Sequence, residues 1–229
     1  MSLANGYASV NGLKMYYERY GTGGVPLVLL HGGAGTIGMF GTVLDTLSRG
    51  RRVIATELQA HGHTADIDRP LRYELMADDV AALVRHLRLE TVDVMGYSIG
   101  GGVALRTAIQ FPELVRKLVL VSSPCKRSGW FPEILVAMQE GAKPEAVEGM
   151  KHSPMYHAYA RVAPRVEDWP VLMSKLAEML RIDYDWSEEV RRMQAPALIV
   201  VGDSDSVTPA HARTAMSAAL RRVRRVVRV

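Results

Sequence analysis

Cysteine is nearly absent from this chain of 229 residues, which contains Cys125 as its single example. One cysteine excludes an internal disulfide and suits a reducing compartment, so we expect a cytoplasmic protein. The sequence also lacks an N-terminal apolar segment of the kind found in signal peptides, and it has no continuous apolar run of roughly 18 residues. We therefore expect neither secretion nor a membrane span.

Acidic residues are missing from the end of the chain, where RRVRRVVRV carries five arginines. The formal net charge is +4, and without those five charges the remainder sums to −1. A nucleic-acid-binding protein carries its basic surface on the body of the fold, so a nucleic-acid partner is not expected. The sequence also lacks clustered Cys, His and Asp residues and the G-x-G-x-x-G pattern, so we expect no metal, nucleotide or flavin cofactor.

What the sequence does contain is an alternation of strand and helix patterns. Residues 7–20 predict two strands joined by an Asn11-Gly12 turn. Short apolar runs predict buried strands at 25–30, 52–56, 92–96, 115–121 and 197–201. Helical spacing or helix-start residues predict helices at 39–47, 76–87, 99–110 and 208–220. This order predicts an α/β protein with a mostly parallel twisted sheet and helices on both faces.

The stretch Gly96-Tyr97-Ser98-Ile99-Gly100 lies between a predicted strand and a predicted helix. A serine at such a sharp turn takes a strained backbone conformation, and the flanking glycines avoid a collision with neighbouring backbone. Its hydroxyl then reaches the helix N-terminus, where unpaired N–H groups favour developing negative charge. The pattern therefore predicts that Ser98 is a nucleophile. The alternative is a glycine-rich helix start that only needs close packing.

Four motifs occur in the order LLHGG, ELQAHGHT, GYSIGG and VVGDSDSVTP. In this order and spacing the chain, from about residue 7 to 220, resembles the α/β-hydrolase superfamily, and in particular its small capped serine esterases and lactonases. The resemblance implies the α/β-hydrolase fold with a helical cap. Because the sequence stops at RRVVRV, we expect the last strand to be short or missing. It implies a core of residues 1–125 and 191–229 and a cap of residues 126–190.

The resemblance also implies roles for individual residues. Ser98 is the expected nucleophile, and the backbone N–H groups of Gly33 and Ile99 are the expected oxyanion hole. Asp205 is the expected acid of the triad, with Asp203 as the second choice. No cofactor or metal is implied.

The catalytic histidine is not found where the resemblance places it, on a loop after the last strand. Only 24 residues follow Asp205, and the one histidine among them, His211, is a weak candidate at the start of a predicted helix. Three explanations stay open: a shortened or frame-altered chain, a base from a partner subunit, or a protein that binds without catalysis. A missing last strand would also expose its neighbour, which predicts lowered stability or a homo-oligomer formed by strand pairing.

The predicted cap contains all three tryptophans and five of the twelve methionines. In WPVLMSKLAEMLRI, the apolar positions 169, 172, 173, 176, 179 and 180 predict an amphipathic helix. Such apolar side chains favour small to medium apolar esters or lactones as substrates. The sequence thus predicts a carboxylic-ester hydrolase that forms an acyl-enzyme on Ser98. The alternatives are a lactonase acting on acyl lactones and a non-catalytic protein that binds small molecules.

Overall fold

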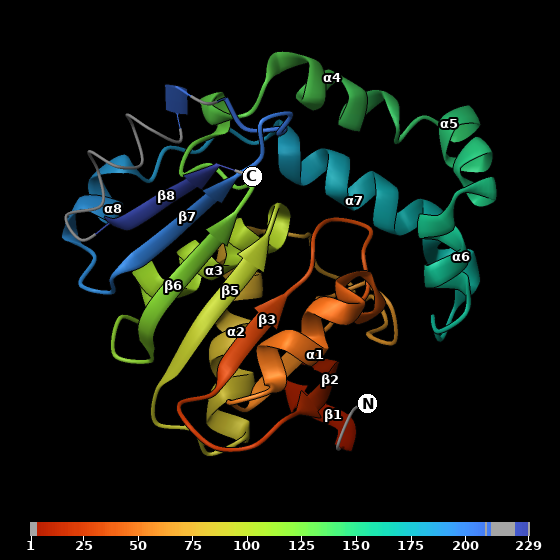
Figure 1. Cartoon of the computed structure of the whole chain (residues 1–229). Coiled ribbons are helices and arrows are strands. Elements are labelled where there is room, and N and C mark those ends of the chain that lie inside the picture. Colours follow the sequence, from red (N-terminus) through yellow and green to blue (C-terminus); the bar gives the residue numbers. More distant parts are fainter. Residues whose placement is uncertain (1–3, 209, 212–222, 229) are drawn as a thin grey trace.

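The computed structural model describes residues 4–208, 210, 211 and 223–228. Eight strands within this described part of the chain form one sheet in the order β1-β2-β4-β3-β5-β6-β7-β8 (Figure 1). The strands are β1 Ala4–Val10, β2 Leu13–Tyr20, β3 Leu27–Leu30, β4 Val53–Thr56, β5 Val92–Tyr97, β6 Val115–Val121, β7 Ala197–Val201 and β8 Val223–Arg228. The pairs β1–β2 and β2–β4 are antiparallel and the other neighbours are parallel, so the predicted mostly parallel sheet is confirmed.

The first two strands form the predicted hairpin around Asn11-Gly12. Asn11 has φ 49° and Gly12 has φ 82°, so both turn residues are left-handed. Asparagine and glycine tolerate this conformation, and such a turn matches the twist of the flanking strands.

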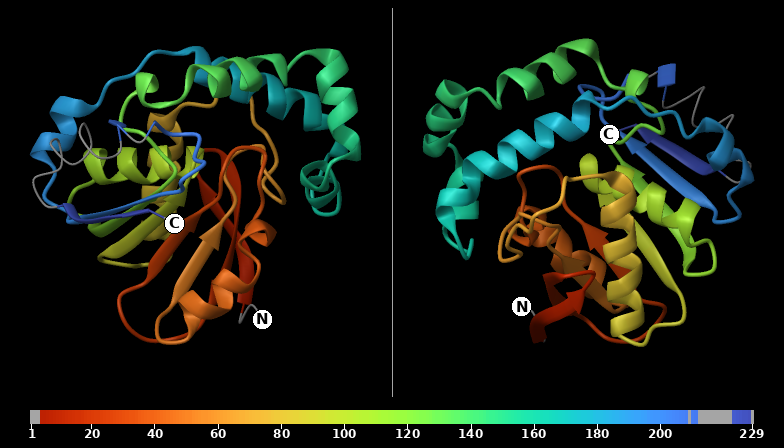
Figure 2. Two further views of the ribbon diagram at one scale, coloured as in Figure 1. Left: turned by 45° about the horizontal axis from the view of Figure 1, so that its top comes forward. Right: turned by 180° about the vertical axis from the view of Figure 1, so that it is seen from behind.

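Helices cover both faces of the sheet, as the sequence predicts. The helices of the core are α1 Thr42–Ser48, α2 Tyr73–His86 and α3 Ile99–Gln110. Figures 1 and 2 show α2 and α3 on one face and α1 on the other. The helix predicted over 39–47 is interrupted at Gly41, where φ 46° and ψ −129° are not helical, so a 3₁₀ turn Ile37–Phe40 precedes α1.

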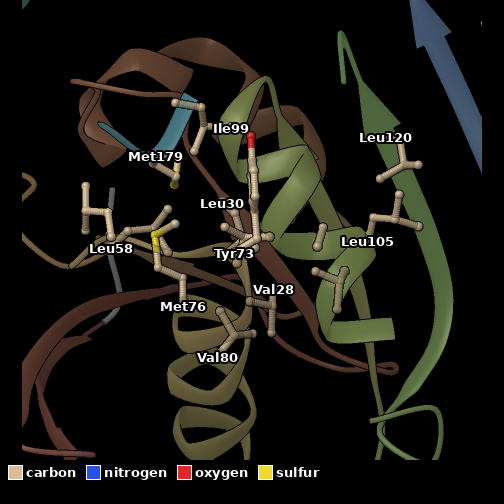
Figure 3. Close-up of a cluster of buried hydrophobic side chains, with 14 of the residues drawn as sticks. Val28, Leu30, Leu58, Tyr73, Met76, Val80, Ile99, Leu105, Leu120 and Met179 are labelled. Atoms are coloured by element: carbon tan, nitrogen blue, oxygen red, sulfur yellow. The ribbon is translucent and has the colours of Figure 1, made fainter. Parts of the chain in front are cut away.

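The main core lies between the sheet and the pair α2 and α3. Figure 3 shows Tyr73, Met76 and Val80 of α2 beside Val28 and Leu30 of β3. All five side chains are buried, and their spacing in α2 follows the helical period. Full burial of each aliphatic side chain is worth roughly 1.5–3 kcal/mol. This packing holds β3, and therefore the loop that follows it, in a fixed position.

The last strand, β8, is present and pairs in parallel with β7. The prediction left open whether this strand is short or missing, and the structure has a strand of six residues here. The prediction that β7 is an exposed edge strand of the sheet is therefore wrong. The helix predicted at 208–220 lies largely outside the described residues.

Between β6 and β7 the chain is helical, in line with the absence of strand patterns there. The helices are α4 Pro132–Glu140, α5 Pro144–Gly149, α6 Pro154–Ala160, α7 Trp169–Arg181 and α8 Ser187–Arg192. The two ends of this segment meet, because Lys126 forms a β-bridge with Asp185 and the Trp186 N–H donates to the Cys125 carbonyl at 3.0 Å. Figure 1 shows α4 and α7 passing over the carboxyl ends of the parallel strands. Among the described residues, no helix has the length and apolar character needed to cross a membrane.

Candidate active site

Ser98 occupies a strained turn between β5 and α3, with φ 53° and ψ −121°. Its N–H donates to the carbonyl of Val121 at 2.8 Å, which ties the turn to the end of β6. A methyl group at Gly96 would lie 2.0 Å from the carbonyl oxygen of Gly100. A methyl group at Gly100 would lie 2.2 Å from the carbonyl oxygen of His31. Only glycine fits at either position, and the strain at the serine between them is typical of a functional site.

The loop after β3 lies directly against this turn. A methyl group at Gly32 would lie 3.4 Å from Cβ of Ser98, and one at Gly33 would lie 2.7 Å from Cδ1 of Ile99. The N–H of Ile99 is at the first position of α3, where a helix offers no acceptor. Among the residues that the structure describes, the N–H of Gly33 has no acceptor either. Two unpaired N–H donors therefore lie close to Ser98.

His31 orients one of these donors. Its Nε2 accepts the N–H of Leu58 at 3.1 Å, so the proton is on Nδ1, which donates to the carbonyl of Gly32 at 2.8 Å. The Gly32 carbonyl and the Gly33 N–H belong to one planar trans peptide and point in opposite directions. The bond from His31 therefore sets the direction of the Gly33 N–H.

His61 secures the next peptide in the same way. Its Nε2 accepts the N–H of Ala34 at 3.1 Å, and its Nδ1–H donates to the carbonyl of Gln59 at 2.7 Å. Burial lowers the pKa of His31 and lowers the pKa of His61 to about 3. Both rings are therefore neutral near pH 7, as these hydrogen bonds require.

Asp205 lies where the ends of β6 and β7 meet. Its Oδ2 accepts the hydroxyl of Ser122 at 2.6 Å and the N–H of Gly202 at 2.8 Å, and its Oδ1 accepts the N–H of Val207 at 3.0 Å. The structure therefore places Asp205, in the loop after β7, beside the end of β6, and β6 pairs with β5, whose end leads to Ser98. Asp203, the second choice for the acid, is an exposed residue of the same turn.

Ser122 is a residue that the sequence reasoning missed. It follows β6, has φ 54° and donates its own N–H to the carbonyl of Val200 in β7. The strands predicted at 115–121 and 197–201 are neighbours in the sheet, and carboxyl ends of parallel neighbours meet at one edge. A prediction of strand order would have placed Ser122 near the acid, but the hydrogen bond between them depends on the packing of the two loops.

His211 is not brought to Asp205. Its Nε2 accepts the N–H of Cys125 at 3.2 Å and lies 3.6 Å from Sγ of the same residue. Burial lowers its pKa to about 4. In the described parts of the chain, no histidine forms a hydrogen bond with Asp205 or Ser98. The same parts contain no group of three or more His, Cys, Asp or Glu residues that could hold a metal ion.

A cavity of about 310 Å³ lies beside the turn and under the helices that follow β6. Every described residue that lines it is apolar. They are Gly33, Ala34, Ile99, Ile134, Ala137, Met138, Gly141, Met150, Met155, Met173, Leu176, Ala177 and Leu180. The cavity therefore adjoins Gly33 and Ile99, the two residues that carry the unpaired N–H groups, and α4 and α7 supply much of its wall.

Comparison with known proteins agrees with this geometry. The family described as the alpha/beta hydrolase fold matches residues 25–144. The chain is 35% identical over 122 residues to an sn-1-specific diacylglycerol lipase of Xenopus laevis, which is 51% of this chain and 39% of that protein. It is 30% identical over 220 residues to the dihydrolipoyllysine-residue acetyltransferase component of the acetoin cleaving system of Pseudomonas putida, which is 90% of this chain and 59% of that protein. The chain thus spans less than two thirds of either relative.

Among solved structures, the enol-lactonase of Burkholderia xenovorans LB400 superposes with a TM-score of 0.79 at 21% identity. This match covers 97% of the present chain and 90% of the lactonase, and it shows the shared fold. With the family match over more than half of its length, the chain belongs to the α/β-hydrolase fold family.

Proposed function

We propose that this protein is a carboxylic-ester hydrolase that forms an acyl-enzyme on Ser98. The observation that carries the proposal is the strained Ser98 beside two N–H groups, of Gly33 and Ile99, that have no acceptor among the described residues. Preorganised donors of this kind stabilise the negative charge of a tetrahedral intermediate. The family's lipase member supports hydrolysis of an ester bond.

In the proposed reaction, Oγ of Ser98 attacks the ester carbonyl carbon. The carbonyl oxygen becomes an oxyanion that accepts hydrogen bonds from the N–H groups of Gly33 and Ile99. The bond to the alcohol oxygen then breaks, and the alcohol leaves with the proton that Ser98 gave up. Water attacks the acyl-enzyme in the same geometry and releases the acid.

Proton transfer in both steps needs a base, and in this proposal Asp205 orients it. Its carboxylate is held by the donors of Ser122, Gly202 and Val207. We assign the role of the base to no described residue, because no described histidine forms a hydrogen bond with Asp205.

Residues 126–190 act as a cap in this proposal, over a core formed by 1–125 and 191–229. The support is that the ends of the segment meet at Lys126 and Asp185, and that the cavity lies between its helices and the turn at Ser98. A cap excludes water from the site, which strengthens the hydrogen bonds made to the oxyanion.

The test is hydrolysis of p-nitrophenyl butyrate by the wild-type chain and by Ser98→Ala, with Ser174→Ala as the matched control. Ser174 is an exposed serine of α7. We expect Ser98→Ala to lower kcat at least about a thousandfold and Ser174→Ala to leave it unchanged. Equal rates for all three proteins would overturn the proposal.

A second candidate function is binding of a small ester without turnover. It is favoured by the absence of a histidine beside Asp205 in the described residues. Saturable binding of the ester, with no difference in hydrolysis between wild type and Ser98→Ala, would support it.

A further inference from the structure

We propose that the cavity binds the acyl chain of the ester, that this chain is uncharged and aliphatic, and that Ala137 limits its length. This inference rests on the proposed function, because it places the ester carbonyl at Gly33 and Ile99. Both residues line the cavity, so a substituent of the carbonyl carbon enters it directly.

The cavity suits the acyl chain better than the alcohol. The alcohol oxygen must receive a proton as it leaves, so a proton donor has to reach it. No residue with a titratable or hydroxyl side chain is among the described residues that line the cavity. Asp205 and Ser122, at the ends of β6 and β7, lie outside this lining. The leaving alcohol is therefore expected on their side of the carbonyl.

The chain must also be uncharged. A carboxylate inside this lining would lose its hydration without gaining a hydrogen bond, which is strongly unfavourable. Lys175 follows Met173 by two positions on α7, but its Nζ is bound to Oδ2 of Asp66 at 2.6 Å and to the carbonyls of Ile67 and Arg69 at 2.9 Å. The ammonium group of Lys175 is thus bound to the loop before α2, and Lys175 is not among the residues that line the cavity.

Size and lining favour a flexible chain of medium length. At about 30 Å³ for each water-sized group, the cavity holds roughly ten methylene-sized groups. Four methionines line it, and their unbranched side chains adapt to a flexible ligand. An octanoyl chain fits this volume, whereas a hexadecanoyl chain exceeds it.

Helix α4 supplies a matched pair of positions for the test. Ala137 lines the cavity and is exposed to solvent, so a larger side chain there can narrow the cavity without disturbing the core. Val136 precedes it, is 58% exposed and is not among the lining residues.

The experiment compares kcat/KM for p-nitrophenyl octanoate and p-nitrophenyl acetate in the wild type, Ala137→Trp and Val136→Trp. We expect Ala137→Trp to lower the ratio of octanoate to acetate activity about tenfold or more, because the chain loses room for several methylenes. Val136→Trp leaves both activities unchanged. An unchanged ratio in Ala137→Trp would overturn the inference.

Binding to the Ser98→Ala protein, measured by titration calorimetry, separates this inference from the proposed function. We expect methyl octanoate to bind more tightly than the monomethyl ester of suberic acid, which adds a terminal carboxylate, and Ala137→Trp to weaken the binding of methyl octanoate. If that pattern appears while wild type shows no hydrolysis, the proposed function fails and the chain site stands. Hydrolysis without preference for the uncharged chain would retain the function and reject the site.

Discussion

Two buried histidines connect the loops after β3 and β4, each accepting a backbone N–H from the loop of the other. His31 accepts from Leu58 and His61 accepts from Ala34, and their rings lie 4.9 Å apart. Loss of either acceptor would leave a buried N–H unpaired, at a cost of about 1–3 kcal/mol. The geometry of the Gly33 peptide therefore depends on both rings remaining neutral.

Stability should fall as these rings are forced to take up protons. The pKa of His61 is lowered from 6.5 to about 3 by burial, so the unfolded chain binds a proton that the folded chain does not. Its contribution is fully present above about pH 6.5 and is lost as the pH falls toward 3, by up to about 1.4 kcal/mol per pH unit. Urea unfolding over this range should show a smaller loss of unfolding free energy in His61→Gln than in wild type.

Glutamine can still accept the Ala34 N–H but does not titrate, so it separates the hydrogen bond from the charge. Circular dichroism at neutral pH checks that the variant is folded. Parallel pH dependences for the two proteins would contradict the neutral His61.

Besides its buried apolar face, helix α7 contacts the core through an ion pair between Lys175 and Asp66. Lys175 and Asp66 have side chains that are 18% and 10% exposed, and two further carbonyls accept from the same ammonium group. Because α7 supplies part of the cavity wall, this contact helps to hold that wall in place.

We expect Lys175→Met to lower the unfolding free energy by roughly 2–3 kcal/mol, since Asp66 would keep a buried charge without its cation. Lys143→Met is the control, because it removes an ion pair with Glu140 in which both side chains are more than half exposed. Such a pair is worth about 0–1 kcal/mol. Similar losses of unfolding free energy in the two variants, measured by urea unfolding, would contradict the larger stabilisation expected from the Lys175–Asp66 pair.

The elements were predictable where local chemistry decides them. The helix at 169–180 follows from its apolar spacing, and the first hairpin follows from Asn11-Gly12. The break at Gly41 was not predictable, because the apolar pattern continues across it and only the backbone angles reveal the interruption. The Lys175–Asp66 contact joins residues 109 positions apart, and no local pattern reports such a pairing.

Across the whole molecule, the sheet brings the candidate residues to one edge. The carboxyl ends of β3, β5, β6 and β7 lead to Gly33, Ser98, Ser122 and Asp205, which are far apart in the sequence. Ligand sites of open parallel sheets form at this edge. The order of the motifs predicted the neighbourhood of Gly33 and Ser98. The sequence could not predict that Ser122 donates a hydrogen bond to Asp205 or that His211 accepts one from Cys125, because both contacts depend on three-dimensional packing.

The most direct test of the account is to trap the acyl group on Ser98. The wild-type protein is mixed with p-nitrophenyl octanoate, quenched with acid within the first turnover, digested and measured by mass spectrometry. We predict one octanoyl group on the peptide that contains Ser98, and none on that peptide in Ser98→Ala. An unmodified Ser98 peptide, or an octanoyl group on another residue in both proteins, would contradict it.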